Sequence, residues 1–302
     1  MTDLPRAGGL LLVDKPAGPT SHDVVAVARR ALGTRRVGHT GTLDPFATGL
    51  LVLCVGSGTR LVEFLTGLPK RYRAGVRLGE RTTTDDPEGD VEATSDAWRS
   101  LARSDVERAL EPLRGAIVQT PSRFSAKKVA GTPAHYRARR GEEVELAPIS
   151  VVVHTLDLLA WDPPALELDV RCSAGTYVRT LARDLGEKLG TGAHLRSLRR
   201  TEVGAFRVTD ALDLDTLHDP DAVARAWIKP PAALAHLPHV QVGADDAARL
   251  AFGQSVPFDA AQNAAADGPL VVLLGDELVA IAERAGERLM PRKVFNSAEP
   301  AA

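Results

Sequence analysis

The alternation of apolar and polar residues along the chain predicts interleaved strands and helices. Apolar runs at 8–13 and 50–55 indicate buried strands, and 166–172 alternates apolar with polar residues, which is typical of a strand with one wet face. Another strand is predicted near 70–78. Hairpin-length spacings favour a mixed, largely antiparallel sheet over a doubly wound parallel one. We therefore predict the α/β (α+β) class, with a sheet flanked by helices.

Helices are predicted where apolar residues recur every three or four positions after a capping residue. The expected helices cover about 22–32, 59–66, 104–111, 177–190 and 211–228. Thr20 or Ser21 supplies the N-cap of the first helix. A capping box that begins at Ser104 opens the third, and Thr176 caps the fourth. The proline pair 230–231 is expected to break the last helix.

The length of the chain suggests two domains. At about 150 residues per domain, 302 residues correspond to two. From about residue 238 a short unit begins, with a helix near 245–252 and two strands around the turn 275–276. We predict a catalytic domain over 1–237 and a small C-terminal domain over 238–302.

Composition excludes disorder and a membrane-embedded chain. Apolar residues make up 44% and charged residues 25%, which are ordinary values for a folded protein. There is no apolar run of about 18 residues and no secretory signal pattern, so a cytoplasmic location is expected. Cys54 and Cys172 lie inside apolar runs and are predicted to be buried thiols.

The net charge of −2 hides a strong asymmetry. Residues 1–209 carry a balance of +5, whereas residues 210–302 carry −7. The segment 119–140 holds six basic residues and no acid. Its members are Arg123, Lys127, Lys128, Arg137, Arg139 and Arg140. Because phosphate binding depends on where positive charge clusters, this segment is predicted to bind phosphate, and the acidic C-terminal unit much less.

The glycine-punctuated loop 37–45 holds the first candidates for chemistry. His39 and Asp44 stand five residues apart in this loop. Loops on a rigid scaffold often carry reactive groups, although Asp-Pro is also a common turn former and a plain turn is the alternative. The loop lacks the glycine spacing of nucleotide-cofactor sites, and the eight histidines show no ligand spacing. No cofactor and no metal are predicted.

A second candidate lies at 172–180, where a strand ends in a glycine turn and a helix begins. Tyr177 and Arg179 are expected in the first turn of that helix. A cation there opposes the helix dipole, so Arg179 either serves a buried carboxylate or phosphate or is simply exposed. The acidic run 84–90 is predicted to be a solvated hairpin tip.

Five segments, in order along the chain, resemble motifs of a known family. They are Asp14–Ser21, Gly38–Leu51, Lys70–Tyr72, Cys172–Arg179 and Leu195–Thr201. In these segments the chain is similar to the TruB family, the bacterial tRNA pseudouridine-55 synthases. The second segment is long enough to make the resemblance specific.

The resemblance implies roles for particular residues. Asp44 would be the nucleophile, paired with Arg179, and Tyr72 would take part in catalysis. The implied substrate-binding residues are Tyr72 and Tyr177 against the target base, His39 beside the flipped nucleotide, Leu198 in the pocket wall, and Lys15 of the lysine-proline motif. Whether the carboxylate adds to sugar C1′ or to the base stays open. Isomerisation of uridine needs no external donor, which agrees with the missing cofactor motif.

The resemblance also implies partners. The segment at about 121–148 resembles an inserted thumb that clamps the T stem-loop of tRNA, so no guide RNA is expected. The C-terminal unit resembles a short PUA-type RNA-binding domain. A monomer without membrane contact is expected. The alternatives are a non-catalytic RNA-binding or tRNA-folding protein, and an N-glycoside hydrolase that would release free base.

Overall fold

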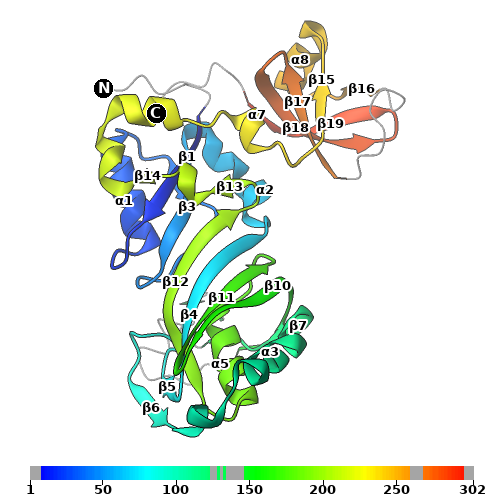
Figure 1. Cartoon of the computed structure of the whole chain (residues 1–302). Coiled ribbons are helices and arrows are strands. Elements are labelled where there is room, and N and C mark those ends of the chain that lie inside the picture. The colour runs from blue at the N-terminus through cyan, green and yellow to red at the C-terminus, as the bar shows by residue number, and fades with distance from the viewer. Residues whose placement is uncertain (1–7, 123–127, 130–131, 134–145, 259–267, 296–302) are drawn as a thin grey trace.

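The structure is a computed structural model that describes residues 8–122, 128–129, 132–133, 146–258 and 268–295. Its largest element is a ten-stranded sheet, in which eight strands run in the order β14-β1-β3-β12-β4-β11-β10-β7 while β2 and β13 pair at its side (Figure 1). The strands are β1 (Gly9–Lys15), β2 (Val37–His39), β3 (Thr48–Val55), β4 (Lys70–Leu78), β7 (Gly115–Gln119), β10 (Ile149–Asp162), β11 (Ala165–Cys172), β12 (Ala193–Val203), β13 (Phe206–Arg207) and β14 (Leu212–Asp213). Among the described strands of this sheet, only β1–β14 and β3–β12 pair in parallel, which confirms the mixed, largely antiparallel prediction.

Helices cover this sheet on its buried sides. They are α1 (Ser21–Ala31), α2 (Val62–Thr66), α3 (Arg103–Leu110), α5 (Val178–Lys188), α6 (Pro220–Ala226) and α7 (Pro230–Ala233). Short 3₁₀ helices occupy 56–61, 97–100, 111–113, 208–210 and 214–218. Two small ribbons complete this part, formed by β5 (Glu80–Thr82) with β6 (Val91–Thr94) and by β8 (Lys128–Val129) with β9 (Thr132–Pro133).

Strand β4 shows how the sequence pattern builds the core. Its even-numbered residues from Lys70 to Leu78 are buried, and its odd-numbered residues are not. The buried face joins one apolar cluster with α3 and α5, so period-two alternation in the strand meets the apolar stripe of each helix. Arginines of β4 stay on the open face, where Arg71 and Arg73 pair with Asp169 of β11.

The large sheet has a narrow waist. Strands β3 and β12 pair only through Thr48 with Arg199 and Gly49 with Arg200. On either side of this junction the core divides into separate apolar clusters. The loop 40–47 leaves the ladder beside the junction, so its side chains can face a cavity rather than a neighbouring strand.

Some predicted helix ends are correct and others are wrong. Thr20 caps α1 as expected, since its hydroxyl accepts from Asp23 N while the Asp23 carboxylate accepts from Thr20 N. The prediction for Ser104 is wrong because α3 begins at Arg103 and the Asp105 carboxylate caps it by accepting from the N–H of Ala102, at 2.7 Å.

Two further predictions are corrected. Thr176 does not cap α5, whose N-cap is Tyr177 without any side-chain cap. The helix expected over 211–228 is divided, because Asp219 and Pro220 start α6 as a new helix. Pro230 begins α7 instead of only ending a helix, since the first helical position needs no N–H donor.

The C-terminal unit is a five-stranded sheet with one helix, α8 (Ala244–Ala251). Its strands are β15 (His239–Gln241), β16 (Val256–Pro257), β17 (Pro269–Leu274), β18 (Glu277–Ala285) and β19 (Arg288–Val294), in the order β15-β17-β18-β19-β16. One face packs around α8. The other face contributes Val271, Leu273 and Ile281 to the same apolar cluster as Leu10 and Leu50 of the large sheet. The two sheets therefore share a core.

This shared core predicts a large loss of stability from a single truncation in β17. Leu273→Ala should lower the free energy of unfolding by about 2–5 kcal/mol, because Leu273 is only 6% exposed and packs between the sheets. Leu274→Ala is the matched control, because Leu274 is the next residue in the strand and is 40% exposed. This substitution should change the free energy of unfolding by only about 0.5 kcal/mol. Urea unfolding measures both. Separate transitions for the two sheets, with Leu273→Ala shifting only one, would contradict a shared core.

Candidate active site

A cavity of about 260 Å³ opens beside the waist of the large sheet. Five segments that are distant in the sequence line it: the loop 40–44, the end of α2 at Thr66, strand β4, the turn leading into α5, and β12. Of the residues predicted for the site, those on its wall are Asp44, Tyr72, Tyr177, Arg179 and Leu198. The structure thus brings together residues that lie up to 154 positions apart in the sequence.

Asp44 and Arg179 form a two-point ion pair. Arg179 Nε lies 3.0 Å from Asp44 Oδ2, and Arg179 Nη2 donates to Asp44 Oδ1 at 3.2 Å. The Asp44 side chain is 32% exposed, whereas that of Arg179 is 6% exposed. The carboxylate therefore faces the cavity, and the guanidinium holds it from behind in a bidentate geometry.

Asp86 is the second carboxylate at this guanidinium, and the sequence interpretation missed it. Arg179 Nη1 lies 3.2 Å from Asp86 Oδ2 and donates to the carbonyl of Thr84 at 3.0 Å. The Asp86 side chain is only 4% exposed. Residues 84–90 do join the paired strands β5 and β6, as predicted for a hairpin tip, and Pro87, Glu88 and Asp90 are exposed. The predicted solvation is wrong for Asp86, because α5 brings its arginines onto this turn.

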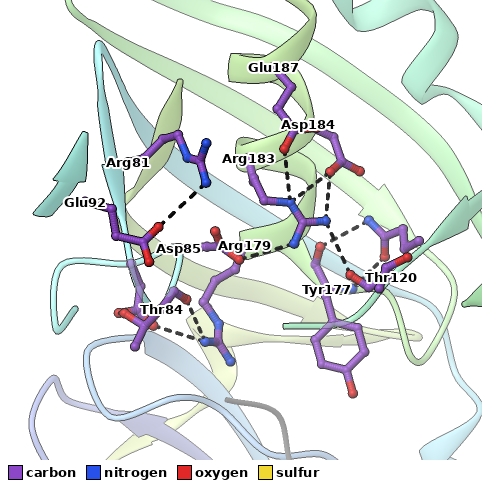
Figure 2. A network of polar contacts seen from close by, with 12 residues as sticks. Arg81, Thr84, Asp85, Glu92, Thr120, Tyr177, Arg179, Arg183, Asp184 and Glu187 are labelled. Atoms are coloured by element: carbon purple, nitrogen blue, oxygen red, sulfur yellow. Dashed lines mark hydrogen bonds and ion pairs between the residues drawn. The ribbon is translucent and has the colours of Figure 1, made fainter. Parts of the chain in front are cut away.

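Figure 2 shows the second such contact in the same network. Arg183 lies one helical turn after Arg179, and its Nη1 is 3.5 Å from Asp85 Oδ2. Burial raises the pKa of Asp85 to about 6, against the opposing effect of the Arg183 charge. An acidic run of seven residues looks solvated in sequence, but two arginines spaced four apart on one helix face are the signal that it has partners.

The surroundings of Asp44 favour its neutral form more than water would. Burial raises the pKa of Asp44 above the ordinary value of 3.8, the Arg179 charge lowers it, and the nearby Asp86 carboxylate raises it again. The half-buried Asp44 and the buried Asp86 share the Arg179 guanidinium. The charge of Arg179 therefore opposes the effects that favour the neutral form of Asp44.

The backbone on both sides of Asp44 is held by side chains from the N-terminal motif. The Ser21 hydroxyl accepts from Leu43 N at 2.9 Å and donates to the Leu43 carbonyl at 3.2 Å. Lys15 Nζ donates to the Pro45 carbonyl at 3.1 Å. With the residues before and after it anchored, Asp44 is presented at a fixed position.

Lys15 lies behind this loop rather than on the cavity wall. It is fully buried, and its ammonium also donates to the carbonyls of Pro16 and Pro19, at 2.8 and 2.7 Å. Burial lowers its pKa to about 8. Three bonds use the three donors of the ammonium, so this geometry gives Lys15 a part in holding the loop.

Arg200 is a further residue that the sequence interpretation assigned no role. It is buried in β12, and its guanidinium donates to the carbonyls of Leu50, Gly41 and Thr42 at 2.7, 3.0 and 3.3 Å. It therefore ties the loop 40–44 to the sheet waist. Gly49 permits this approach, since its φ is +102° and a Cβ there would collide with the Arg200 backbone.

The remaining predicted residues lie elsewhere. His39 packs edge-on against His22 at 5.6 Å between ring centres, and its Nδ1 accepts from Gly41 N at 3.2 Å. Burial lowers the pKa of His39, and the residue does not line the cavity. Lys128 belongs to β8, whose side chains are not described, and five predicted RNA-backbone residues lie outside the described residues: Arg123, Lys127, Arg137, Arg139 and Arg140.

Neither the pattern of a metal-ligand cluster nor that of a membrane-spanning helix occurs among the described residues. Among residues 8–122, 146–258 and 268–295, His, Cys, Asp and Glu side chains nowhere gather in threes as metal ligands would. None of the helices described is both long and apolar enough for a membrane crossing. What the cavity offers is a positioned carboxylate among aromatic and aliphatic walls, which suits covalent chemistry on a small cyclic group.

Comparison with known proteins identifies a family over most of the chain. Residues 29–178 match the "TruB family pseudouridylate synthase (N terminal domain)", and residues 179–232 match the "tRNA pseudouridylate synthase B C-terminal domain". The protein named tRNA pseudouridine synthase B from Arthrobacter sp. (strain FB24) is 44% identical, over 95% of this chain and 96% of its own. The protein of that name from Rhodococcus jostii (strain RHA1) is 49% identical, over 82% of this chain and 81% of its own.

Solved structures share the architecture. A Cbf5-Nop10-Gar1 complex contains a chain that matches with a TM-score of 0.74 at 25% identity, covering 98% of this chain and 87% of that one. An archaeal box H/ACA sRNP Nop10-Cbf5 complex gives a TM-score of 0.73 at 24% identity, over 97% and 88% of the two chains. The mixed sheet with its C-terminal sheet is therefore a fold already seen in solved structures.

Proposed function

Because the chain belongs to the TruB family of pseudouridylate synthases and is an enzyme of that kind, we propose that it isomerises uridine to pseudouridine at position 55, in the T arm of tRNA. The observation that carries the proposal is the Asp44–Arg179 ion pair on the wall of a cavity of about 260 Å³. Matching relatives are named for tRNA, which supports the substrate class.

Asp44 acts as the nucleophile in this proposal. The reaction breaks the N-glycosidic bond, turns the base and joins its C5 to sugar C1′. The proton of C5 is released and N1 takes up a proton, so the composition is unchanged and no external donor is consumed. A carboxylate adds covalently to the nucleotide and leaves again, as in other covalent catalysis. Arg179 keeps Asp44 ionised for the attack.

The target base leaves its own stack to reach Asp44. Tyr72 and Tyr177 line the cavity, and Leu198 completes the wall. Stacking on an aromatic ring contributes about 1–3 kcal/mol per base, which offsets the few kcal/mol that flipping costs. Flipping a base out of a structured RNA loop costs less free energy than flipping one out of a duplex, in agreement with a T stem-loop substrate.

The rest of the chain binds and holds the RNA. We assign residues 1–237 to the catalytic domain, with a thumb at about 121–148, and residues 238–302 to a PUA-like domain. The basic charge of the thumb segment supports RNA binding without a guide RNA. The enzyme then works as a monomer in the cytoplasm, where tRNA is modified.

The two alternatives fit the site less well. A pure RNA-binding or tRNA-folding protein gains nothing from Asp44 and Asp86, because carboxylates repel phosphate. An N-glycoside hydrolase would release free base and leave an abasic tRNA. Product analysis separates these reactions.

The deciding experiment is incubation with tRNA labelled with tritium at uridine C5. The expected result is release of tritium to water, together with intact tRNA of unchanged mass apart from the label. Release of free uracil would indicate hydrolysis. Tight tRNA binding without tritium release would indicate a non-catalytic protein.

The thumb charges should dominate the salt dependence of binding. Replacing Arg137, Arg139 and Arg140 with Gln removes three charges, and the slope of log affinity against log salt should fall by about 0.7–0.9 for each lost phosphate contact. Arg99, Arg103 and Arg108 form the control, because each already pairs with a neighbouring acid on the surface. Filter binding at several salt concentrations measures the slope. Equal changes in the two triple variants would contradict a role for the thumb charges.

A further inference from the structure

Gln119 is the last residue of β7, at the point where the thumb segment leaves the sheet. Its partner across the ladder is Ile149, the first residue of β10, so these two residues close the stem of the segment 120–148. The Gln119 side chain is fully buried. Burying a side-chain amide costs free energy unless its N–H and its carbonyl both form hydrogen bonds. The hydrogen-bond partners of the Gln119 amide lie outside β7, at the start of α5.

Both partners belong to one residue, Tyr177. The Gln119 Nε2 donates to the Tyr177 carbonyl at 3.2 Å, and the Tyr177 N–H donates to Gln119 Oε1 at 3.0 Å. The amide thus pairs with the backbone of Tyr177 as a neighbouring strand would. Two bonds fix the rotation of this backbone segment as well as its position, which one bond would not do.

Tyr177 is the residue from which α5 starts. It is the N-cap, its backbone is extended with φ −96° and ψ 106°, and it has no side-chain cap. The Tyr177 ring lines the cavity, and Arg179 follows two residues later with its bonds to Asp44. Any displacement of the Tyr177 backbone therefore moves a wall of the cavity and the guanidinium that holds the nucleophile.

A second contact joins the thumb stem to α5. Arg183 Nη2 donates to the carbonyl of Thr120 at 3.3 Å, directly after Gln119 in the chain. In Figure 2, Arg183 reaches Thr120 on one side and Asp85 on the other, one turn beyond Arg179. The stem therefore contacts the start of α5 at two residues, Tyr177 and Arg183.

We propose that Gln119 is a positioning residue for the isomerisation. Its amide holds the start of α5 so that Tyr177 and Arg179 face the cavity in the reactive arrangement, and it links the stem of the thumb to the arginine of the site. The assignment rests on the proposed function. It places the effect of Gln119 on the chemical step, whereas a residue that only supports the thumb would affect RNA affinity.

Two substitutions at this position test the assignment. Gln119→Leu removes both bonds at similar size, and Gln119→Glu keeps the acceptor but loses the donor. Single-turnover tritium release at saturating enzyme should fall ten- to a hundredfold in Gln119→Leu, since a misplacement of about 1 Å costs up to that much. The dissociation constant for tRNA should change less than about threefold. Gln241→Leu is the control, because Gln241 is exposed, donates only to the Gly275 carbonyl, and should leave both values unchanged.

The pH response of Gln119→Glu adds a test that a merely structural role would not pass. When the introduced carboxyl group is protonated, its O–H replaces the lost amide donor. The rate of this variant relative to wild type should therefore rise as the pH is lowered from 8 to 6. The ratio removes the titration of Asp44, which both proteins share.

Several results would overturn the assignment. A wild-type rate in Gln119→Leu, or a loss confined to tRNA affinity, would do so. If Gln119→Leu fails to fold, as judged by its melting curve, the Gln119→Glu ratio decides, and a ratio that is flat with pH overturns the proposal. Wild-type protein that releases no tritium would contradict the proposed function itself, and the positioning role with it.

Discussion

Replacing Asp44 with Asn is expected to abolish isomerisation while the protein still folds and binds tRNA. Asn has the shape of Asp but cannot form the covalent bond to the nucleotide, so tritium release should fall by about 10⁴-fold or more. The fold should survive because Arg179 keeps its second partner, Asp86, at 3.2 Å. The Asn carbonyl can also still accept a hydrogen bond from Arg179.

The control for this substitution is Asp157→Asn. Asp157 lies on β10, is 63% exposed and faces Arg114 at 3.9 Å, so neither activity nor stability should change measurably. Single-turnover kinetics, tRNA binding and thermal melting are measured for both variants. Turnover of Asp44→Asn within about tenfold of wild type would remove Asp44 as nucleophile.

Replacing Arg179 with Met is expected to produce a large loss of activity at neutral pH, with partial recovery at higher pH. Without the guanidinium, the half-buried Asp44 faces the buried Asp86 with no cation between them, so the pKa of Asp44 rises further above 3.8. The reaction needs the ionised form, which is present above that pKa and lost as the pH falls through it. The acid limb of the rate profile should therefore move to higher pH.

The free energy of unfolding of Arg179→Met should also depend on pH, because it is linked to the protonation of Asp44. Removing one partner of a buried ion pair costs about 3–5 kcal/mol at neutral pH. Because the pKa of Asp44 in the folded variant is raised, the stability linked to Asp44 should be lost as the pH rises from the unfolded value of 3.8 through the folded value. Urea unfolding between pH 4 and 8 measures this slope.

Asp86→Asn is expected to shift the rate profile in the direction opposite to that of Arg179→Met. Removing the Asp86 charge takes away one of the effects that raise the pKa of Asp44, so the acid limb should move to lower pH. Tritium release between pH 5 and 9 follows both variants against wild type. A rate profile that does not move in Arg179→Met would mean that Arg179 only positions RNA.

The burial of Asp86 in the run 84–90 shows where sequence reasoning failed. Four acids within seven residues are typical of a solvated turn, and no property of the run itself indicates otherwise. Asp86 is buried because Arg179, 93 positions later, donates to it. Charge compensation across such a distance depends on how α5 packs against the sheet, and the local sequence contains no record of that packing.

Lys15 and Arg200 illustrate the same limit for the site. A lysine in a loop motif and an arginine in a basic strand both suggest contacts with RNA phosphate. In the structure their donors go to carbonyl groups of the loop that carries Asp44 and of its surroundings. Hydrogen bonding of a buried loop backbone is obligatory, so these side chains are used to satisfy it.

The sequence by itself determined the features that depend on local periodicity and backbone chemistry. The strand at 70–78, the N-cap of the first helix, the largely antiparallel sheet and the family motifs could all be read from neighbouring residues. The tertiary structure alone decided which charges are compensated, which polar side chains hold the loop around Asp44, and that the C-terminal sheet shares a core with the large one. The physical reason is that burial and ion pairing depend on contacts between residues far apart in the chain, whereas helix and strand patterns repeat within a few residues.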